Sequence, residues 1–190
     1  MKFAPSGDMA TPKGLRRGSI KAPFDGDMRR TWAIQQTGAV IHVTTIAARV
    51  TKDAIEMASD SQLTGSHIAQ HNYTKIYHIA GALVGISGGA AACEDFVEWF
   101  RKGAKRKKFP VSCECEFSGC HALVATRTGC KVFECSPVPV STGKIDATGS
   151  GGGFAIAAML AGASVRDSVK VAAKLDPHTG GRITVKRIEL

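Results

Sequence analysis

The sequence lacks any apolar run long enough to cross a lipid bilayer, although the chain has 190 residues. A membrane-spanning helix needs roughly 20 predominantly apolar residues in succession. The opening stretch, Met1–Asp8, also lacks the apolar region of a secretory signal peptide. We therefore expect no membrane partner and a protein that stays in the cytoplasm, where it is made.

Acidic residues are scarce relative to basic ones. The 16 Asp and Glu residues stand against 25 Lys and Arg residues, which gives a net charge of +9. Such an excess is compatible with nucleic acid or another acidic partner. The densest basic run, Arg101–Lys108, nevertheless has no aromatic residues between its charges, as binding of single-stranded nucleic acid would require. We interpret this run as a solvated helix end, where cations favour the helix dipole, and expect no nucleic-acid partner.

The cysteines lack the paired C-x2-C spacing of zinc ribbons. Five of the six cysteines lie between Cys113 and Cys135, and His121 is beside Cys120. Their spacings, C-x-C and C-x4-C, do not match the usual structural zinc sites. For a protein that is not exported we expect reduced, buried thiols and no metal, with a zinc site as the open alternative.

The start of the chain has no sustained hydrophobic periodicity. Residues 1–38 carry Gly, Pro and basic pairs such as Arg16-Arg17 and Arg29-Arg30, a composition typical of an arm rather than of a packed core. The whole length is that of one domain. We predict a basic leader over 1–43, serving as a propeptide or as an assembly arm, and a folded domain over 44–190.

The domain alternates strand and helix patterns. We predict a strand hairpin over 44–60, strands within 68–79 and over 82–87, 113–117, 122–126, 131–135 and 182–188, and helices that begin near Ala90, Phe154 and Ser164. The segment 154–161 is apolar all round, which predicts a buried helix, and Ser150 before it could cap that helix. This order of elements indicates two sheets packed between helix layers.

The hairpin brings two reactive groups together. Thr44 opens its first strand and Asp60 closes its second, so a hydroxyl and a carboxylate lie near each other, an arrangement that suggests chemistry. A structural explanation is also open, because Thr favours strands and Asp often ends them.

Five landmarks together resemble a known family. They are Thr44-Thr45-Ile46, Ser59-Asp60-Ser61, Lys75, Gly88-Gly89-Ala90-Ala91, and Gly149-Ser150-Gly151-Gly152 followed by Asp176-Pro177-His178-Thr179-Gly180. In order and spacing they are similar to the proteasome β-subunit and HslV branch of the N-terminal-nucleophile (Ntn) hydrolases, from Thr44 to about Leu190. The resemblance implies an α+β fold, a four-layer αββα sandwich. Only residues 109–119 fill the interval where relatives have a second outer helix, so we expect that helix to be missing.

The resemblance also implies roles for seven catalytic positions. Thr44 matches the nucleophile, whose own α-amine serves as the base. Asp60 and Lys75 match the ion pair behind the nucleophile, although a purely structural buried pair is the open alternative. Gly88 matches the residue whose amide faces the developing oxyanion. The groups around the threonine amine correspond to Ser150, Asp176 and Thr179, the last of which is usually serine in the family.

Substrate and partners follow from the same resemblance. An extended polypeptide would pair with backbone near Thr64 and Ala90, and Ile86 would form the floor of the first specificity pocket, favouring apolar side chains. No cofactor or metal is implied. A homo-oligomeric ring is implied, with an ATPase unfoldase or assembly neighbours as further partners.

Two functions remain open because the chain departs from the family at the cleavage point. The residue before Thr44 is Val43, where relatives commonly have glycine, and a β-branched residue hinders the strained turn that self-cleavage needs. The first function is a threonine endopeptidase that becomes active when the leader is removed. The second is a catalytically silent subunit of a larger assembly, for example a phage virion, that keeps the leader as a binding arm.

Overall fold

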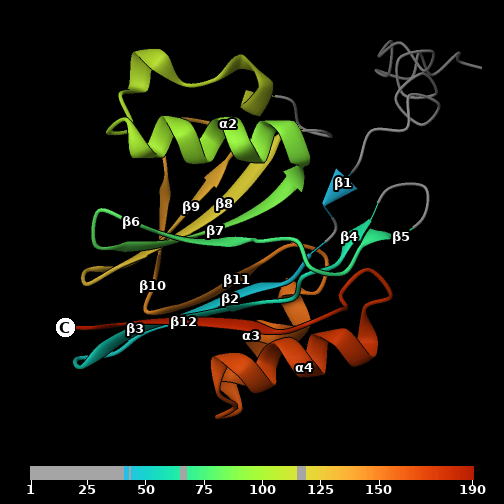
Figure 1. Cartoon of the computed structure of the whole chain (residues 1–190). Coiled ribbons are helices and arrows are strands. Elements are labelled where there is room, and N and C mark those ends of the chain that lie inside the picture. Colours follow the sequence, from blue (N-terminus) through green and yellow to red (C-terminus); the bar gives the residue numbers. More distant parts are fainter. Residues whose placement is uncertain (1–40, 43, 65–67, 115–118) are drawn as a thin grey trace, which may run out of the picture.

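The computed structural model describes residues 41–42, 44–64, 68–114 and 119–190. Two antiparallel sheets lie face to face, with α2 outside one and α3 and α4 outside the other (Figure 1). This arrangement confirms the α+β, four-layer prediction. The predicted leader, apart from the short strand β1 (Ile41–His42), lies outside the described residues. No helix among the described residues is long and apolar enough to cross a membrane.

The first sheet has six strands, in the order β1-β7-β8-β9-β10 with β6 also paired to β7. Its remaining strands are β6 (Ile76–Ile79), β7 (Ala82–Gly89), β8 (Cys120–Thr126), β9 (Gly129–Glu134) and β10 (Val140–Gly143). Alternating side chains of β7 serve two layers: Val84 and Ile86 pack under α2, whereas Leu83 packs between the sheets. Strand β7 is therefore buried on both faces, which explains why its sequence is an almost continuous apolar run.

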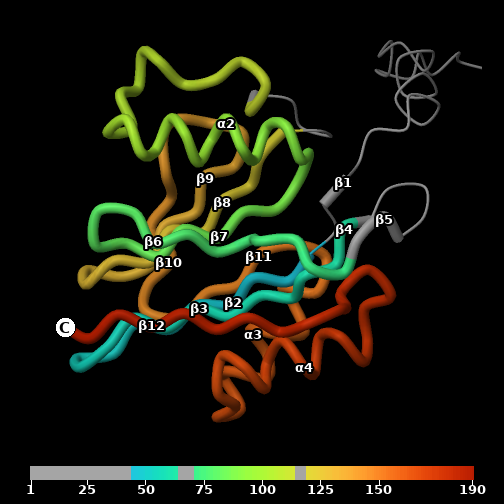
Figure 2. Tube along the Cα trace, in the orientation of Figure 1, coloured from blue at the N-terminus to red at the C-terminus, as the bar shows by residue number. Residues whose placement is uncertain are grey.

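The second sheet has the order β11-β2-β3-β12. Its strands are β2 (Ile46–Val50), β3 (Ala54–Ser59), β11 (Ile145–Thr148) and β12 (Thr184–Glu189). The hairpin β2–β3 pairs Ile46 with Ser59 and Val50 with Ile55, as the alternation predicted. A separate small pair is formed by β4 (Leu63–Thr64) and β5 (Ile68–Gln70). The chain passes from the first sheet to the second directly from β10 to β11 (Figure 2).

Three α-helices occur among the described residues: α2 (Ala90–Arg101), α3 (Gly152–Leu160) and α4 (Val165–Leu175). The side chain of Ser164 accepts a hydrogen bond from the amide of Asp167 and caps α4, as predicted. The prediction that α3 is buried all round is wrong, because Phe154 is 42% exposed and Leu160 is 73% exposed. Only one side of α3 packs on the second sheet and α4.

The second outer helix is missing, as expected. Between α2 and β8 the described chain has only the short 3₁₀ helices Arg106–Lys108 and Val111–Glu114. The strand predicted over 113–117 is therefore wrong at Cys113 and Glu114, and the rest of it lies outside the described residues. The Cys113 thiol donates to the carbonyl of Ala92, 3.1 Å away, which ties this turn to α2. Phe109 is buried, with its ring 5.0 Å from that of Trp99, and it covers the core above α2.

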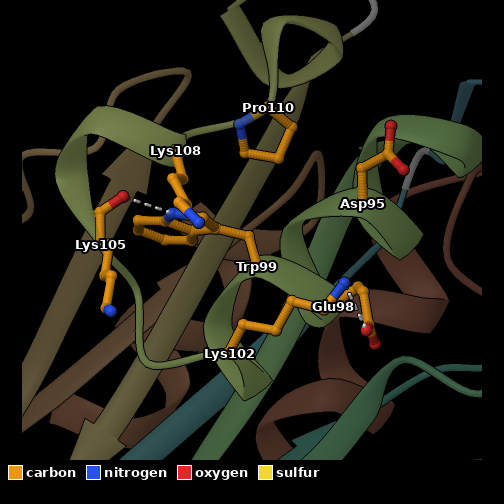
Figure 3. Close-up of a pocket in the computed structure, with 7 residues that line it drawn as sticks. All are labelled: Asp95, Glu98, Trp99, Lys102, Lys105, Lys108 and Pro110. Carbon is orange, nitrogen blue, oxygen red and sulfur yellow. Dashed lines mark hydrogen bonds and ion pairs between the residues drawn. The ribbon is translucent and has the colours of Figure 1, made fainter.

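The basic run does not form the last turn of α2, contrary to expectation. The helix ends at Arg101, and Gly103 then takes a φ of +88°. The indole nitrogen of Trp99 donates to the carbonyl of Lys105 at 3.0 Å, so the basic turn folds back over the helix (Figure 3). A hollow of about 360 Å³ lies there, lined by Asp95, Glu98, Trp99, Lys102, Lys105, Lys108 and Pro110. None of the predicted site residues lines it.

Four of the cysteines that the structure describes, Cys93, Cys113, Cys120 and Cys130, are free thiols. Cys93, Cys113, Cys120 and Cys130 are buried, and Cys135 is half-buried. Burial raises the pKa of Cys113 and of Cys130 to about 12, so both remain protonated near neutral pH. Within the described part of the chain, no three His, Cys, Asp or Glu side chains gather to hold a metal ion.

Candidate active site

Three of the predicted catalytic side chains lie together at one end of the sandwich. Thr44 stands two residues before β2, and Asp60 follows β3 directly, so pairing of these strands brings them side by side. The amide of Thr45 donates to Asp60 Oδ1 at 3.0 Å, and the amide of Asp60 donates to the carbonyl of Thr45 at 3.3 Å. Thr44 and Asp60 are both fully buried.

Lys75 joins this pair from the first sheet. Its ammonium group donates to the hydroxyl of Thr44, to Asp60 Oδ1 at 2.9 Å and to the carbonyl of Gln62 at 2.5 Å. An ammonium has three N–H groups, so every donor has an acceptor. Burial lowers the pKa of Lys75, and the charge of Asp60 opposes that effect. The lysine therefore loses its proton more readily than an exposed lysine does.

Asp60 is held on both of its oxygens. Oδ1 accepts from Thr45 and Lys75, while Oδ2 accepts from the amides of Gln62 and Gly180, each at 3.1 Å. A buried carboxylate is stable only when it is paired and hydrogen-bonded in this way. These bonds hold the aspartate, and through it the lysine, in one position.

Gly88, another predicted catalytic position, lies in β7. Its backbone has a φ of +117°, a conformation that side-chain-bearing residues rarely adopt. A Cβ atom there would lie 2.1 Å from the carbonyl oxygen of Gly119. The strand pairing places Gly88 between His42 of β1 and Cys120 of β8. Only glycine fits this position without moving the neighbouring backbone.

The other three predicted catalytic residues form a second, adjoining network. Ser150 Oγ and Thr179 Oγ1 both donate to Asp176 Oδ2, at 2.6 and 2.5 Å. Ser150 does not cap α3, since the N-cap is Gly151 and no side chain caps it. The hydroxyls of Thr179 and Thr45 are 2.6 Å apart. Because Thr179 uses its proton on the carboxylate, Thr45 is the donor to Thr179.

Sequence reasoning missed the part played by Thr45 and by two glycines. A Cβ atom on Gly149 would lie 2.0 Å from the carbonyl oxygen of Thr44, and one on Gly151 would lie 2.0 Å from Thr45 Oγ1. The Gly149-Ser150-Gly151 turn therefore packs directly against the threonine pair. The doublet Thr44-Thr45 was the available signal, but the contact that explains it spans more than one hundred residues of chain.

The pKa of Asp176 makes the contribution of this network to stability depend on pH. Burial raises its pKa, but the hydrogen bonds from Ser150, Thr179 and the amide of His178 outweigh that effect, so the pKa lies below its ordinary value. The resulting stabilisation is fully present above the unfolded pKa of about 4 and is lost as the pH falls through the lower folded pKa.

We therefore expect Asp176→Asn to be less stable than the wild type at neutral pH, and we expect this difference to shrink in acid. Urea unfolding of both proteins between about pH 2 and pH 6 measures it. Asp53→Asn, in the exposed hairpin turn, is the control. A difference that stays constant over this range would contradict the proposed network.

Two of the three predicted substrate-binding positions, Thr64 and Ala90, lie in segments that adjoin β1. Thr64 ends β4, and Ala90 opens α2 directly after β7. Strand β1 pairs antiparallel with β7, Ile41 opposite Gly89 and His42 opposite Gly88, and it also contacts β4. Residues 41–42 thus occupy the position predicted for an extended peptide. Ile86 is buried in the core under α2.

Comparisons with known proteins agree with this fold. The family model described as "Proteasome subunit" matches residues 40–129. Eukaryotic HslV from Trypanosoma brucei is 21% identical, with a TM-score of 0.63, over 77% of this chain and 100% of that one. BPH from Thiobacillus denitrificans, solved in complex with epoxomicin, is 20% identical, with a TM-score of 0.60, over 77% of this chain and 99% of that one. No curated protein matches the chain. Residues 40–129 thus match the proteasome subunit family, and the chain has the fold of the HslV and BPH structures.

Proposed function

We propose that the chain is a threonine endopeptidase that hydrolyses peptide bonds with Thr44 once the leader, 1–43, has been cleaved away. The contact of the Lys75 ammonium with both the Thr44 hydroxyl and the Asp60 carboxylate carries the proposal. All three residues are buried together. A structural ion pair alone would not need a hydroxyl as its third member.

In the mature enzyme the α-amine of Thr44 would act as the base. An α-amine has a pKa of about 8, so it can take the hydroxyl proton at neutral pH. The hydroxyl oxygen then attacks the substrate carbonyl, and the negative oxygen that forms faces the amide of Gly88. Collapse of this intermediate gives the proton to the leaving amine and forms an ester on Thr44. Water hydrolyses the ester and restores the hydroxyl.

Cleavage before Thr44 needs another base, because the amine is still part of the peptide bond. Lys75 would serve in its neutral form: its nitrogen contacts the hydroxyl, and burial lowers its pKa, which favours loss of its proton. Attack of that hydroxyl on the carbonyl of Val43 would break the C–N bond, transfer a proton to the nitrogen and leave an ester that water hydrolyses. The roles of Ser150, Asp176 and Thr179 would then be to position the newly freed amine.

One observation favours the second function, a silent subunit. Strand β1 pairs the leader with β7 at Gly88–Gly89, where a substrate would bind, so the uncut chain blocks its own site. With Val43 hindering cleavage, the leader would persist as an arm in an assembly such as a virion. In either function we propose a homo-oligomeric ring. A polypeptide substrate, an ATPase unfoldase and a cytoplasmic location belong to the first function.

Intact-mass measurement of the purified full-length protein separates the two functions. We expect wild type and Thr44→Ser to yield a chain that begins at residue 44, because both keep a hydroxyl. Thr44→Ala should stay uncut, with cleavage slowed by about 10³-fold or more. A wild-type protein that stays full-length and turns over no peptide would contradict the peptidase and support the silent subunit.

A further inference from the structure

A small hollow lies where the edge strands of the two sheets, β10 and β11, adjoin. Its volume is about 220 Å³. The polar side chains that line it come from three strands: Glu134 from β9, Thr142 from β10, and Asp146 and Thr148 from β11. The function proposed above makes no use of these four residues.

The side chain of Asp146 faces the space between the two sheets. In the pairing of β11 with β2 it is opposite Ala48, and side chains directly opposite each other on paired strands share a face. Ala48 packs in the core between the sheets. Asp146 is only 9% exposed. Burying a carboxylate at such a position is costly unless a partner compensates its charge.

One oxygen of this buried carboxylate has no partner. Asp146 Oδ1 accepts a hydrogen bond from the amide of Ala147 at 2.7 Å. Oδ2 is buried as well, and no donor among the described residues reaches it. Buried polar atoms in proteins are almost always satisfied, by protein groups, by ordered water or by an ion. The unpaired Oδ2 therefore indicates that the hollow holds a bound group.

Glu134 brings a second carboxylate to the same hollow. It alternates along β9 with Val132, which packs between the sheets, so both side chains are on the inner face of that strand. His121 is opposite Glu134 on β8, but neither it nor any other described basic residue forms an ion pair with Glu134 or Asp146. Two negative charges around one small hollow repel each other, and a cation bound there would remove this repulsion.

The basic residues that neighbour Asp146 in its sheet are directed elsewhere. The ammonium of Lys144, two positions earlier in the chain, donates to the carbonyl of Arg127 at 3.2 Å. Arg49, next to Ala48 in β2, is on the helix side of the sheet, where its guanidinium donates to two carbonyls of the α3–α4 connection at 3.2 and 2.7 Å. The counter-charge for the hollow must therefore come from a bound group.

The available donors suit a hard divalent cation. The hydroxyls of Thr142 and Thr148 add to the two carboxylates, and no sulfur or imidazole is among the described groups that line the hollow. Mg²⁺ is usually held through one or two carboxylates and keeps several of its own waters. A water molecule occupies about 30 Å³, so the hollow has room for such a hydrated ion.

We propose that this hollow binds a hydrated divalent cation of the Mg²⁺ type between Glu134 of β9 and Asp146 of β11. The ion would link the edge of the first sheet to the edge of the second. It would also hold the end of β11 that leads into the Gly149-Ser150-Gly151 turn. The inference does not depend on the peptidase function, because a silent subunit would have the same site.

Thermal unfolding of the purified full-length protein in EDTA and in Mg²⁺, at matched ionic strength, tests the site. We expect Mg²⁺ at about 100-fold its Kd to raise the Tm by about 5–10 °C, and a Mg²⁺ titration of the Tm to give that Kd. Asp146→Asn and Glu134→Gln should each weaken binding by about 10-fold or more, because each removes one charge that attracts the ion. Asp53→Asn, which removes a charge from an exposed turn, should bind Mg²⁺ as the wild type does.

The stability of Asp146→Asn without metal provides a second readout. Asparagine keeps an oxygen for the amide of Ala147 but removes the uncompensated charge. In EDTA we therefore expect this variant to have a Tm equal to or above that of the wild type, and in Mg²⁺ we expect the order to reverse. A variant that is less stable than the wild type by the same amount in both conditions would show that Asp146 is only structural and would overturn the site.

Three further results would contradict the proposal. A wild-type Tm that does not respond to Mg²⁺ would show that no ion binds. An equal rise for the wild type, Asp146→Asn and Glu134→Gln would show that the ion binds elsewhere. A Tm in EDTA that increases with protein concentration, and no longer does so in Asp146→Asn, would assign the counter-charge to a Lys or Arg of a second copy instead of a metal ion.

Discussion

Replacing Lys75 with methionine is expected to abolish cleavage before Thr44 and to lower the free energy of unfolding by about 3–5 kcal/mol. The large loss of stability follows from Asp60, which would remain fully buried without its cation. The loss of cleavage follows from Thr44, whose hydroxyl would lose the nitrogen that contacts it, a loss worth about 100- to 10,000-fold in rate. Urea denaturation and intact mass measure the two effects.

A double variant separates chemistry from stability. Lys75→Met with Asp60→Asn removes both charges, so we expect part of the stability to return while cleavage remains absent. Lys52→Met, at the exposed turn of the β2–β3 hairpin, is the control and should behave as the wild type. Cleavage at the wild-type rate in Lys75→Met would show that the lysine is only a structural member of the pocket.

Gly88→Ala is expected to have the second-largest effect on the free energy of unfolding and on cleavage before Thr44. A residue with a side chain at a φ of +117° costs about 1–3 kcal/mol in backbone strain. The added Cβ would also meet the carbonyl oxygen of Gly119 at 2.1 Å, which forces β7 and the chain before β8 apart and costs a further ~1–3 kcal/mol. In the proposed mechanism the Gly88 amide faces the oxyanion. Displacing that amide should therefore slow cleavage before Thr44 as well.

Gly103→Ala provides the matched control. Gly103 has a similar positive φ of +88°, but a Cβ atom there would meet nothing within 4 Å. The variant Gly103→Ala should therefore lose only the stability that corresponds to backbone strain, and cleavage before Thr44 should be unchanged. Equal stabilities of Gly88→Ala and Gly103→Ala would show that the contact with Gly119 is unimportant.

The hairpin and the buried strands were predictable because burial alternates along them. Ile46, Ala48 and Val50 face the space between the sheets, so a simple pattern marks β2. Strand β10 was missed because all four of its residues are exposed and show no alternation. The turn at Cys113 looked like a strand because the bond that fixes it goes to Ala92, a contact that no local pattern reveals.

The site was predictable only in part. Thr44 and Asp60 could be brought together by the hairpin alone, but Lys75 enters from the other sheet and was expected from the family resemblance. The links from Thr45 to Thr179 and from Ser150 to Asp176 depend on distant segments meeting in space. These contacts cannot be inferred from a single sequence. The wrong prediction for α3 has a similar cause, because an apolar helix surface does not by itself show what covers it.

Strand β1 has a further consequence for the newly made chain. An open sheet margin is a template on which other extended polypeptides can add, which leads to aggregation. By pairing with Gly88 and Gly89, residues 41–42 cover that margin of β7 within the same molecule. If the chain is cleaved before Thr44, as proposed above, the same cut that frees the Thr44 amine would also remove residues 41–42 and expose this edge of β7.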